Sequence, residues 1–174
     1  MNFTLAQSIE ILERTPDVLD FWLKNLSDDW VRNNEGEDTW SAFDIVGHLI
    51  HGEQTDWMVR MEMILSDNTD KSFEPFDRFA QFKKSKGKSL EQLLTEFKIL
   101  RKENLERLSA WHLSSEDLQE EGIHPTFGKV TLQQLLSAWV VHDLNHLSQI
   151  SRVMAMQYKE EVGPWVEFLG VLKR

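Results

Sequence analysis

Cysteine is absent from this sequence of 174 residues. That absence excludes disulfides, thiolate metal ligands and a cysteine nucleophile, so any metal site has to use histidine or oxygen ligands. A chain without cysteine also fits a reducing compartment. The amino-terminal stretch "MNFTLAQSIEILERTPD" lacks the basic region, apolar block and small-residue cleavage site of a secretion signal. We therefore expect a cytoplasmic protein.

Long hydrophobic runs and positive charge are scarce as well. No apolar stretch approaches the roughly 20 residues of a membrane-spanning helix, so we expect a soluble protein. With 19 Lys and Arg against 29 Asp and Glu, the formal charge of −10 repels phosphate backbones and anionic membranes. The basic cluster "KKSKGK" falls in a predicted loop, and we interpret it as solvated. We expect a small-molecule substrate, with neither nucleic acid nor membrane as partner.

What the chain does contain is apolar residues at helical spacing. Hydrophobic residues make up 41% of the sequence, enough for one core, and we predict a single domain over residues 1–174. β-branched residues are too scattered to form alternating strands, so the pattern predicts an all-α protein.

Two helical segments are predicted in the first part of the chain. The first covers about residues 5–26, where Thr15-Pro16 resembles a cap followed by a proline at a first helical position and favours two short helices. The second begins after Ser41, with Asp44 in its electropositive first turn, and extends to about Leu65.

A long connection and a third helix follow. Residues 67–88 lack sustained periodicity, apart from a predicted helical turn near residues 76–82. Ser89 and Gln92 then form a capping box that opens a helix ending near Trp111. A connection of this length within a compact domain is often functional or a crossover.

The last part of the chain is predicted to hold the longest helix. The stretch "EEGIHPTFGKV" is rich in turn residues, and we expect it to be irregular. Thr131 and Gln134 form another capping box, which opens a helix over residues 132–156. The tail "GPWVEFLGVLKR" is apolar enough to form a short helix docked on the rest.

Two histidines lie four residues apart on the predicted 132–156 helix. Leu135, Trp139, His142, His146 and Ile150 recur at steps of three and four, which places both histidines on an inward-facing stripe. Such a pair can direct two imidazoles at one metal ion. The spacing alone leaves open the alternative that both are ordinary core histidines.

The second predicted helix supplies a candidate third ligand in "FDIVGHLIHGE". His48 lies on its inward face, and Gly47 leaves room for close approach. His51 is a lower-ranked alternative, either as a ligand or as a hydrogen-bond donor to one. Three neutral imidazoles suit zinc or nickel and leave at least one coordination position for water or substrate.

Several polar residues adjoin these histidines and are candidates to orient them. Asp143, Asn145 and Gln149 are close to the pair in sequence, and Asp44 lies one turn before His48. Their alternative roles are helix-surface solvation, interhelical hydrogen bonding and, for Asp44, capping. His124 precedes a proline in a predicted loop and is a candidate for the mouth of the site.

These residues resemble the DinB/YfiT-like superfamily of small bacterial four-helix-bundle proteins. The resemblance rests on "WSAFDIVGHLIHGE", "HPTFGKVTLQQLLSAWVVHDLNHLSQI" and the tail "VGPWVEFLG". It implies a four-helix bundle with a long connection between its second and third helices, and a short C-terminal helix. The family's metal motif, one histidine on the second helix and H-x-x-x-H on a later one, falls on His48, His142 and His146. Dimerisation is common among similar proteins, so a homodimer is also implied.

Members with known activity resemble metal-dependent thiol transferases, which act on a low-molecular-weight thiol such as bacillithiol or mycothiol. The resemblance thus implies a divalent-metal-dependent S-transferase with such a thiol as cosubstrate. The lack of cysteine agrees with an external thiol, but equally with metal-bound water in a hydrolase. A bundle without catalytic activity, acting in a stress response or an interaction with or without metal, is the alternative of another class.

Overall fold

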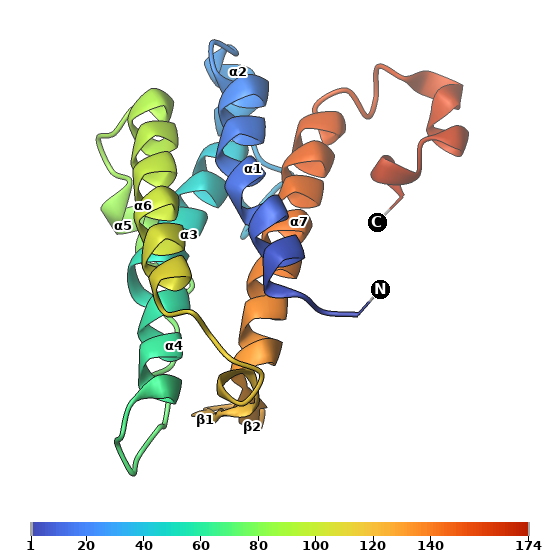
Figure 1. Ribbon diagram of the computed structural model, residues 1–174. Helices are drawn as coiled ribbons and strands as arrows, with labels where there is room; N and C mark the ends of the chain where they lie inside the picture. Colours follow the sequence, from blue (N-terminus) through green and yellow to red (C-terminus); the bar gives the residue numbers. More distant parts are fainter. Residues whose placement is uncertain (1, 174) are drawn as a thin grey trace.

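The computed structural model describes residues 2–173 and shows a four-helix bundle (Figure 1). The first helix is α1, Leu5–Leu23, and the second is formed by α3, Ala42–Thr55, continued by α4, Trp57–Leu65. The third and fourth are α6, Leu90–Ala110, and α7, Leu132–Met156. The all-α expectation is confirmed for the bundle, and no helix in residues 2–173 is both long and apolar enough to cross a membrane.

Shorter elements lie in the connections between the bundle helices and in the segment that follows α7. They are α2, Asp28–Arg32, α5, Ala80–Lys84, the 3-10 helices η1, Asp117–Gln119, η2, Gly163–Phe168, and η3, Gly170–Leu172, and the strands β1, Glu121–His124, and β2, Gly128–Thr131. The predicted helical turn at residues 76–82 corresponds to α5, shifted by a few residues. The predicted C-terminal helix is the pair of 3-10 helices, in which Leu172 is buried and Trp165 is 69% exposed.

Side-chain caps fix where the bundle helices begin. The Ser41 hydroxyl accepts a hydrogen bond from the Asp44 backbone N–H at 3.2 Å, and the Asp44 carboxylate accepts one from the Ser41 N–H at 3.0 Å. Thr131 and Gln134 exchange the same pair of bonds at the start of α7. The two predicted capping boxes, at the starts of α6 and α7, are confirmed, and Ser41 with Asp44 forms a third at the start of α3.

The prediction of two short helices at Thr15-Pro16 is wrong, because α1 continues through Pro16. Proline has no N–H, so the carbonyl of Leu12, one turn earlier, loses its usual helical donor. The guanidinium of Arg101 on α6 donates to that carbonyl instead, with a distance of 2.8 Å from Nη1 to the oxygen. A partner from another helix thus satisfies the group that would otherwise break α1.

The predicted second helix is interrupted at Asp56, where the backbone has φ −118° and ψ −74°. The interruption lets Trp57, at the start of α4, turn inward, where it is 6% exposed. Its ring stacks on that of Trp139 on α7 with 5.9 Å between centroids. Burial of this aromatic pair compensates for the break in the helix.

The stretch predicted as irregular before α7 forms an antiparallel hairpin of β1 and β2. Gly128, with φ 70°, adopts the left-handed backbone that its tight turn requires. The long connection pairs with the hairpin, since the Phe73 N–H donates to the Ile123 carbonyl at 2.8 Å and the Ile123 N–H to the Lys71 carbonyl at 2.9 Å. The hairpin and the connection therefore form one unit beside the bundle.

Candidate metal centre

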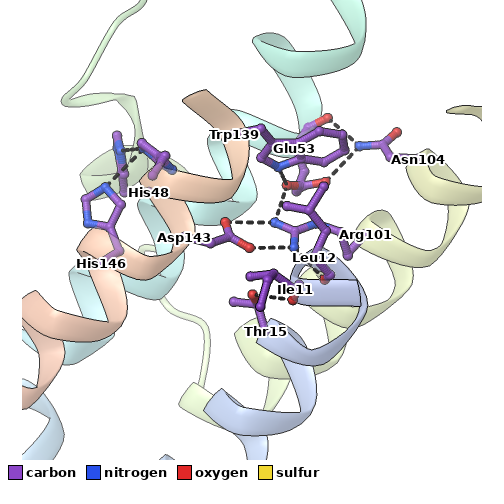
Figure 2. A network of polar contacts seen from close by, with 11 residues as sticks. Ile11, Leu12, Thr15, His48, Glu53, Arg101, Asn104, Trp139, Asp143 and His146 are labelled. Atoms are coloured by element: carbon purple, nitrogen blue, oxygen red, sulfur yellow. Dashed lines mark hydrogen bonds and ion pairs between the residues drawn. The ribbon is translucent and has the colours of Figure 1, made fainter. Parts of the chain in front are cut away.

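Three imidazoles converge between α3 and α7. The Nε2 atom of His142 lies 3.1 Å from Nε2 of His48 and 3.1 Å from Nε2 of His146. One ligand atom from each of the three residues lies within 4.8 Å of the others. Figure 2 shows His48 and His146 turned toward one another from their two helices. The structure thus brings together the three histidines that the sequence singles out.

The spacing of these nitrogens fits a divalent metal ion. Two nitrogens at zinc-like bond lengths and a tetrahedral angle are separated by about 3.3 Å. Without an ion, Nε2 of His142 faces the Nε2 atoms of both His48 and His146. A proton on His142 Nε2 can form a hydrogen bond in only one of these two contacts. The Nδ1 atom of His146 lies 2.8 Å from Oε1 of Gln149, which can accept the Nδ1 proton and leave the Nε2 lone pair for a metal.

Burial keeps the three rings neutral at ordinary pH. It lowers the pKa of His48 to about 3 and that of His142 to about 2, with smaller contributions from neighbouring histidines. Burial also lowers the pKa of His146, against opposing effects of Gln149 and Asp143. A neutral imidazole is the form that binds a metal, so the site is ready for one without first losing protons.

Aromatic rings surround the imidazoles. Trp40 lies 4.8 Å from His48 between ring centroids, and Phe76 of the long connection lies 5.5 Å from His48. Trp57 lies 5.1 Å from His142. These rings limit the access of water to the backs of the imidazoles. Sequence reasoning did not assign Phe76 to the site, since no pattern tells which side of the connection faces the bundle.

The histidines open onto a cavity of about 1150 Å³. Its walls come from residues 35–40, α3 and α4, the long connection, the hairpin turn and the polar face of α7. Asn145 and Gln149 line it beside the histidines, and His124 lines it at the hairpin. The three imidazoles therefore leave a side of the cluster open to a ligand of substantial size, and His124 lies where the sequence placed it.

The structure separates His51 from the cluster. Its Nδ1 lies 2.9 Å from Nζ of Lys84 and 3.3 Å from the Thr55 hydroxyl, so it links α3 to α5. Burial and the Lys84 charge lower the pKa of His51. It does not belong to the group that could hold a metal.

The remaining polar candidates have different roles. Asp44 is a cap, and its Oδ2 accepts from the Ser41 hydroxyl at 2.6 Å rather than from His48. Asp143 turns away from the imidazoles toward Arg101, so its predicted role of orienting a ligand through a direct hydrogen bond is not what the geometry shows. Asn145 lines the cavity, and Gln149 is the residue that contacts a ligand nitrogen.

Behind the histidines lies a buried polar network that sequence reasoning missed (Figure 2). Arg101 lies 2.6 Å from Oδ2 of Asp143 and 2.8 Å from Oε1 of Glu53, with all three side chains at most 1% exposed. Glu53 also accepts from Asn104 at 3.0 Å and from the Trp139 indole N–H at 3.1 Å. The network joins α3, α6 and α7, and through the Leu12 carbonyl also α1. Its only signal in the sequence is a set of charged residues at inward-facing helical positions.

Comparisons with known proteins agree with this architecture. The family model of the DinB superfamily matches residues 11–150. Among solved structures, the chain is similar to YfiT from Bacillus subtilis, with a TM-score of 0.73, 20% identity, and coverage of 93% of this chain and 91% of that chain. That protein is described as "a probable metal-dependent hydrolase with an unusual four-helix bundle topology". Comparison with curated proteins found no match.

Proposed function

Because the chain belongs to the DinB superfamily, we propose that it is a divalent-metal-dependent enzyme that joins a small thiol, through its sulfur, to an electrophilic substrate. The observation that carries the proposal is the convergence of the Nε2 atoms of His48, His142 and His146 at the wall of a large cavity. Zinc and nickel suit three imidazole ligands. A purely structural ion would not need a cavity at its open side.

An ion in this position would supply Lewis acidity that lowers the pKa of a bound thiol or water. The side chains of the chain itself provide the rest. Gln149 orients the His146 ring, and Trp40 and Trp57 exclude water from the backs of the imidazoles. Since the sequence contains no cysteine, the thiol has to come from a cosubstrate.

A metal-dependent hydrolase is the second candidate. It is supported by the description of the similar YfiT structure and by a buried carboxylate in the cavity wall, that of Asp56. Burial raises the pKa of Asp56 and so increases its basicity, while the Arg60 charge opposes the shift. A more basic carboxylate favours proton abstraction from water.

The test begins with protein purified without a histidine tag, followed by metal analysis. The zinc- and nickel-loaded forms, the metal-free form and His142→Ala are then assayed for consumption of thiols by a panel of electrophiles and for hydrolysis of esters and amides. Metal-dependent thiol consumption supports the transferase, and metal-dependent hydrolysis supports the hydrolase. Protein that retains no added zinc or nickel and shows neither reaction supports a bundle without catalytic activity and overturns the proposal.

A further inference from the structure

His124 is held in one tautomer at the hairpin end of the cavity. The backbone N–H groups of Thr126 and Phe127 donate to its Nδ1 at 3.1 and 3.2 Å. A ring nitrogen that accepts two hydrogen bonds carries no proton, so Nε2 carries the proton of the neutral ring. Phe127 stacks on the imidazole with 4.5 Å between centroids and fixes its plane. Among residues 2–173, no hydrogen bond to Nε2 is found, which leaves this N–H available to a ligand.

Arg60 reaches the same region from α4. Its Nε lies 2.7 Å from Oδ1 of Asp56, and its Nη2 makes a long contact of 3.4 Å to the Glu74 carbonyl. No partner of Nη1 is found in the described part of the chain. The guanidinium lies 5.2 Å from the centroid of the Phe73 ring.

The two donors share a support and face the same space. The His124 and Phe73 rings meet edge-on, with 6.4 Å between their centroids, and the guanidinium of Arg60 contacts the same Phe73 ring. Both side chains line the cavity into which the three-histidine cluster opens. A neutral N–H donor beside a guanidinium N–H matches the two oxygens of a carboxylate.

Resting on the function proposed above, we propose that His124 and Arg60 form a subsite for a carboxylate group of the substrate or thiol cosubstrate. The charges at the hairpin end of the cavity determine how much negative charge a bound anion can carry. Asp56 offsets the positive charge of Arg60, and His124 is neutral, so these side chains favour a monoanion over a phosphate dianion. The ligand would extend from the histidine cluster to the hairpin, with its carboxylate bound by these two side chains.

The test uses the full-length protein loaded with Co²⁺, whose d–d absorption reports the metal site independently of any thiol. Three mercaptocarboxylates of increasing length, 3-mercaptopropionate, 6-mercaptohexanoate and 11-mercaptoundecanoate, are titrated against the mercaptoalcohols of the same lengths. Binding is followed by thiolate-to-cobalt charge-transfer absorption. At the length that reaches the hairpin, the carboxylate is expected to bind about tenfold more tightly than the alcohol.

His124→Asn separates the subsite from the hairpin turn. The asparagine oxygen still accepts the N–H groups of Thr126 and Phe127, whereas the Nε2 donor is lost. The carboxylate preference is expected to fall at least about threefold, with unchanged d–d bands and unchanged affinity for alcohols. His112→Asn is the matched control, because His112 is exposed and outside the cavity.

Each result decides between the two proposals. Equal affinities for carboxylate and alcohol at all three lengths, or a preference unchanged in His124→Asn, overturn the subsite and leave the metal site intact. Absence of Co²⁺ absorption overturns the proposed function. The subsite is then tested in metal-free protein with hexanoate, hexan-1-ol and inorganic phosphate, followed by tryptophan fluorescence. Tighter binding of hexanoate than of the other two supports it, and any other order overturns it.

Discussion

Arg101 donates a hydrogen bond to the backbone carbonyl of Leu12, which lies on a different helix and has no helical donor because Pro16 follows it one turn later. The same guanidinium forms ion pairs with two buried carboxylates, those of Glu53 and Asp143. The proline in α1 and the charged cluster between the helices are thus parts of one arrangement. The cluster anchors α7 at Asp143, which directly follows His142, and so holds the helix that carries two of the three clustered histidines.

Replacing Arg101 by methionine leaves two buried carboxylates without their cation and the Leu12 carbonyl without its donor. We expect a loss of about 3–5 kcal/mol in the free energy of unfolding. Removing one partner of a buried ion pair leaves an uncompensated charge, which costs far more than removing both partners. Urea denaturation measures the loss. Lys102→Met is the matched control, since its neighbouring side chain is 76% exposed, and it should change stability by less than about 0.5 kcal/mol. Similar losses in both variants would contradict the role of Arg101.

The elements that the sequence predicted correctly are those specified by short-range patterns. The helix start at Ser41 and the capping boxes at Ser89 and Thr131 require only residues three apart, and the inward position of His142 and His146 follows from the helical period. The match of His48 to the same site came from the family resemblance together with its helix face. The structure confirms that the three imidazoles meet.

The elements that were missed depend on contacts between distant segments. Each strand of the hairpin has four residues, too few for a clear alternation, and one strand pairs with Phe73 about 50 positions earlier. Helix α1 continues through Pro16 because Arg101 lies on another helix. The break at Asp56 is accompanied by stacking of Trp57 on Trp139 of another helix. None of these partners can be identified from the local sequence.

The three-histidine site predicts a sharp difference between neighbouring histidines of α3. His48→Ala should abolish stoichiometric binding of Co²⁺ or Zn²⁺, because it reduces the protein ligands from three imidazoles to two. His142→Ala and His146→Ala should do the same. His51→Ala should retain full stoichiometry, because its Nδ1 contacts Lys84 and not the cluster. Metal analysis after gel filtration measures the effect, and loss of metal in His51→Ala would show that the assignment is wrong.

Adding metal should also stabilise the folded protein. An ion at one hundred times its dissociation constant contributes about 2.7 kcal/mol if it binds only the native state. For a chain of this size, this corresponds to a rise in melting temperature of roughly 5–11 °C. Thermal melts with and without chelator measure the shift, with His142→Ala as the control that should show none. Equal shifts in the two proteins would indicate binding elsewhere.

The metal-free protein should lose stability as the pH falls below about 6.5. Burial lowers the pKa of folded His48 to about 3 and that of His142 to about 2, whereas histidine in an unfolded chain has a pKa of about 6.5. Between these pKa values the unfolded chain binds more protons than the folded one. The contribution of these histidines to the free energy of unfolding is therefore fully present above about pH 6.5 and is lost progressively as the pH falls toward about 3. We expect a decrease of at least about 2 kcal/mol between pH 7 and pH 5 in chelator. A double variant, His48→Leu with His142→Leu, should show a clearly smaller decrease, and an equal one would contradict this assignment.

Gly47, next to His48, lies where α5 packs on α3. A side-chain Cβ at this position would overlap the Ser85 hydroxyl, while its next contacts, the Gln81 and Ser85 Cβ atoms, would be at ordinary distances of 3.4 and 3.5 Å. Gly47→Ala should therefore cost about 1–3 kcal/mol in the free energy of unfolding, and the cost should largely disappear when it is measured in a Ser85→Ala background. Gly170→Ala is the control, because no atom lies within 4 Å of its Cβ. If the cost of Gly47→Ala were the same with and without the Ser85 hydroxyl, contact with that hydroxyl would not be its cause.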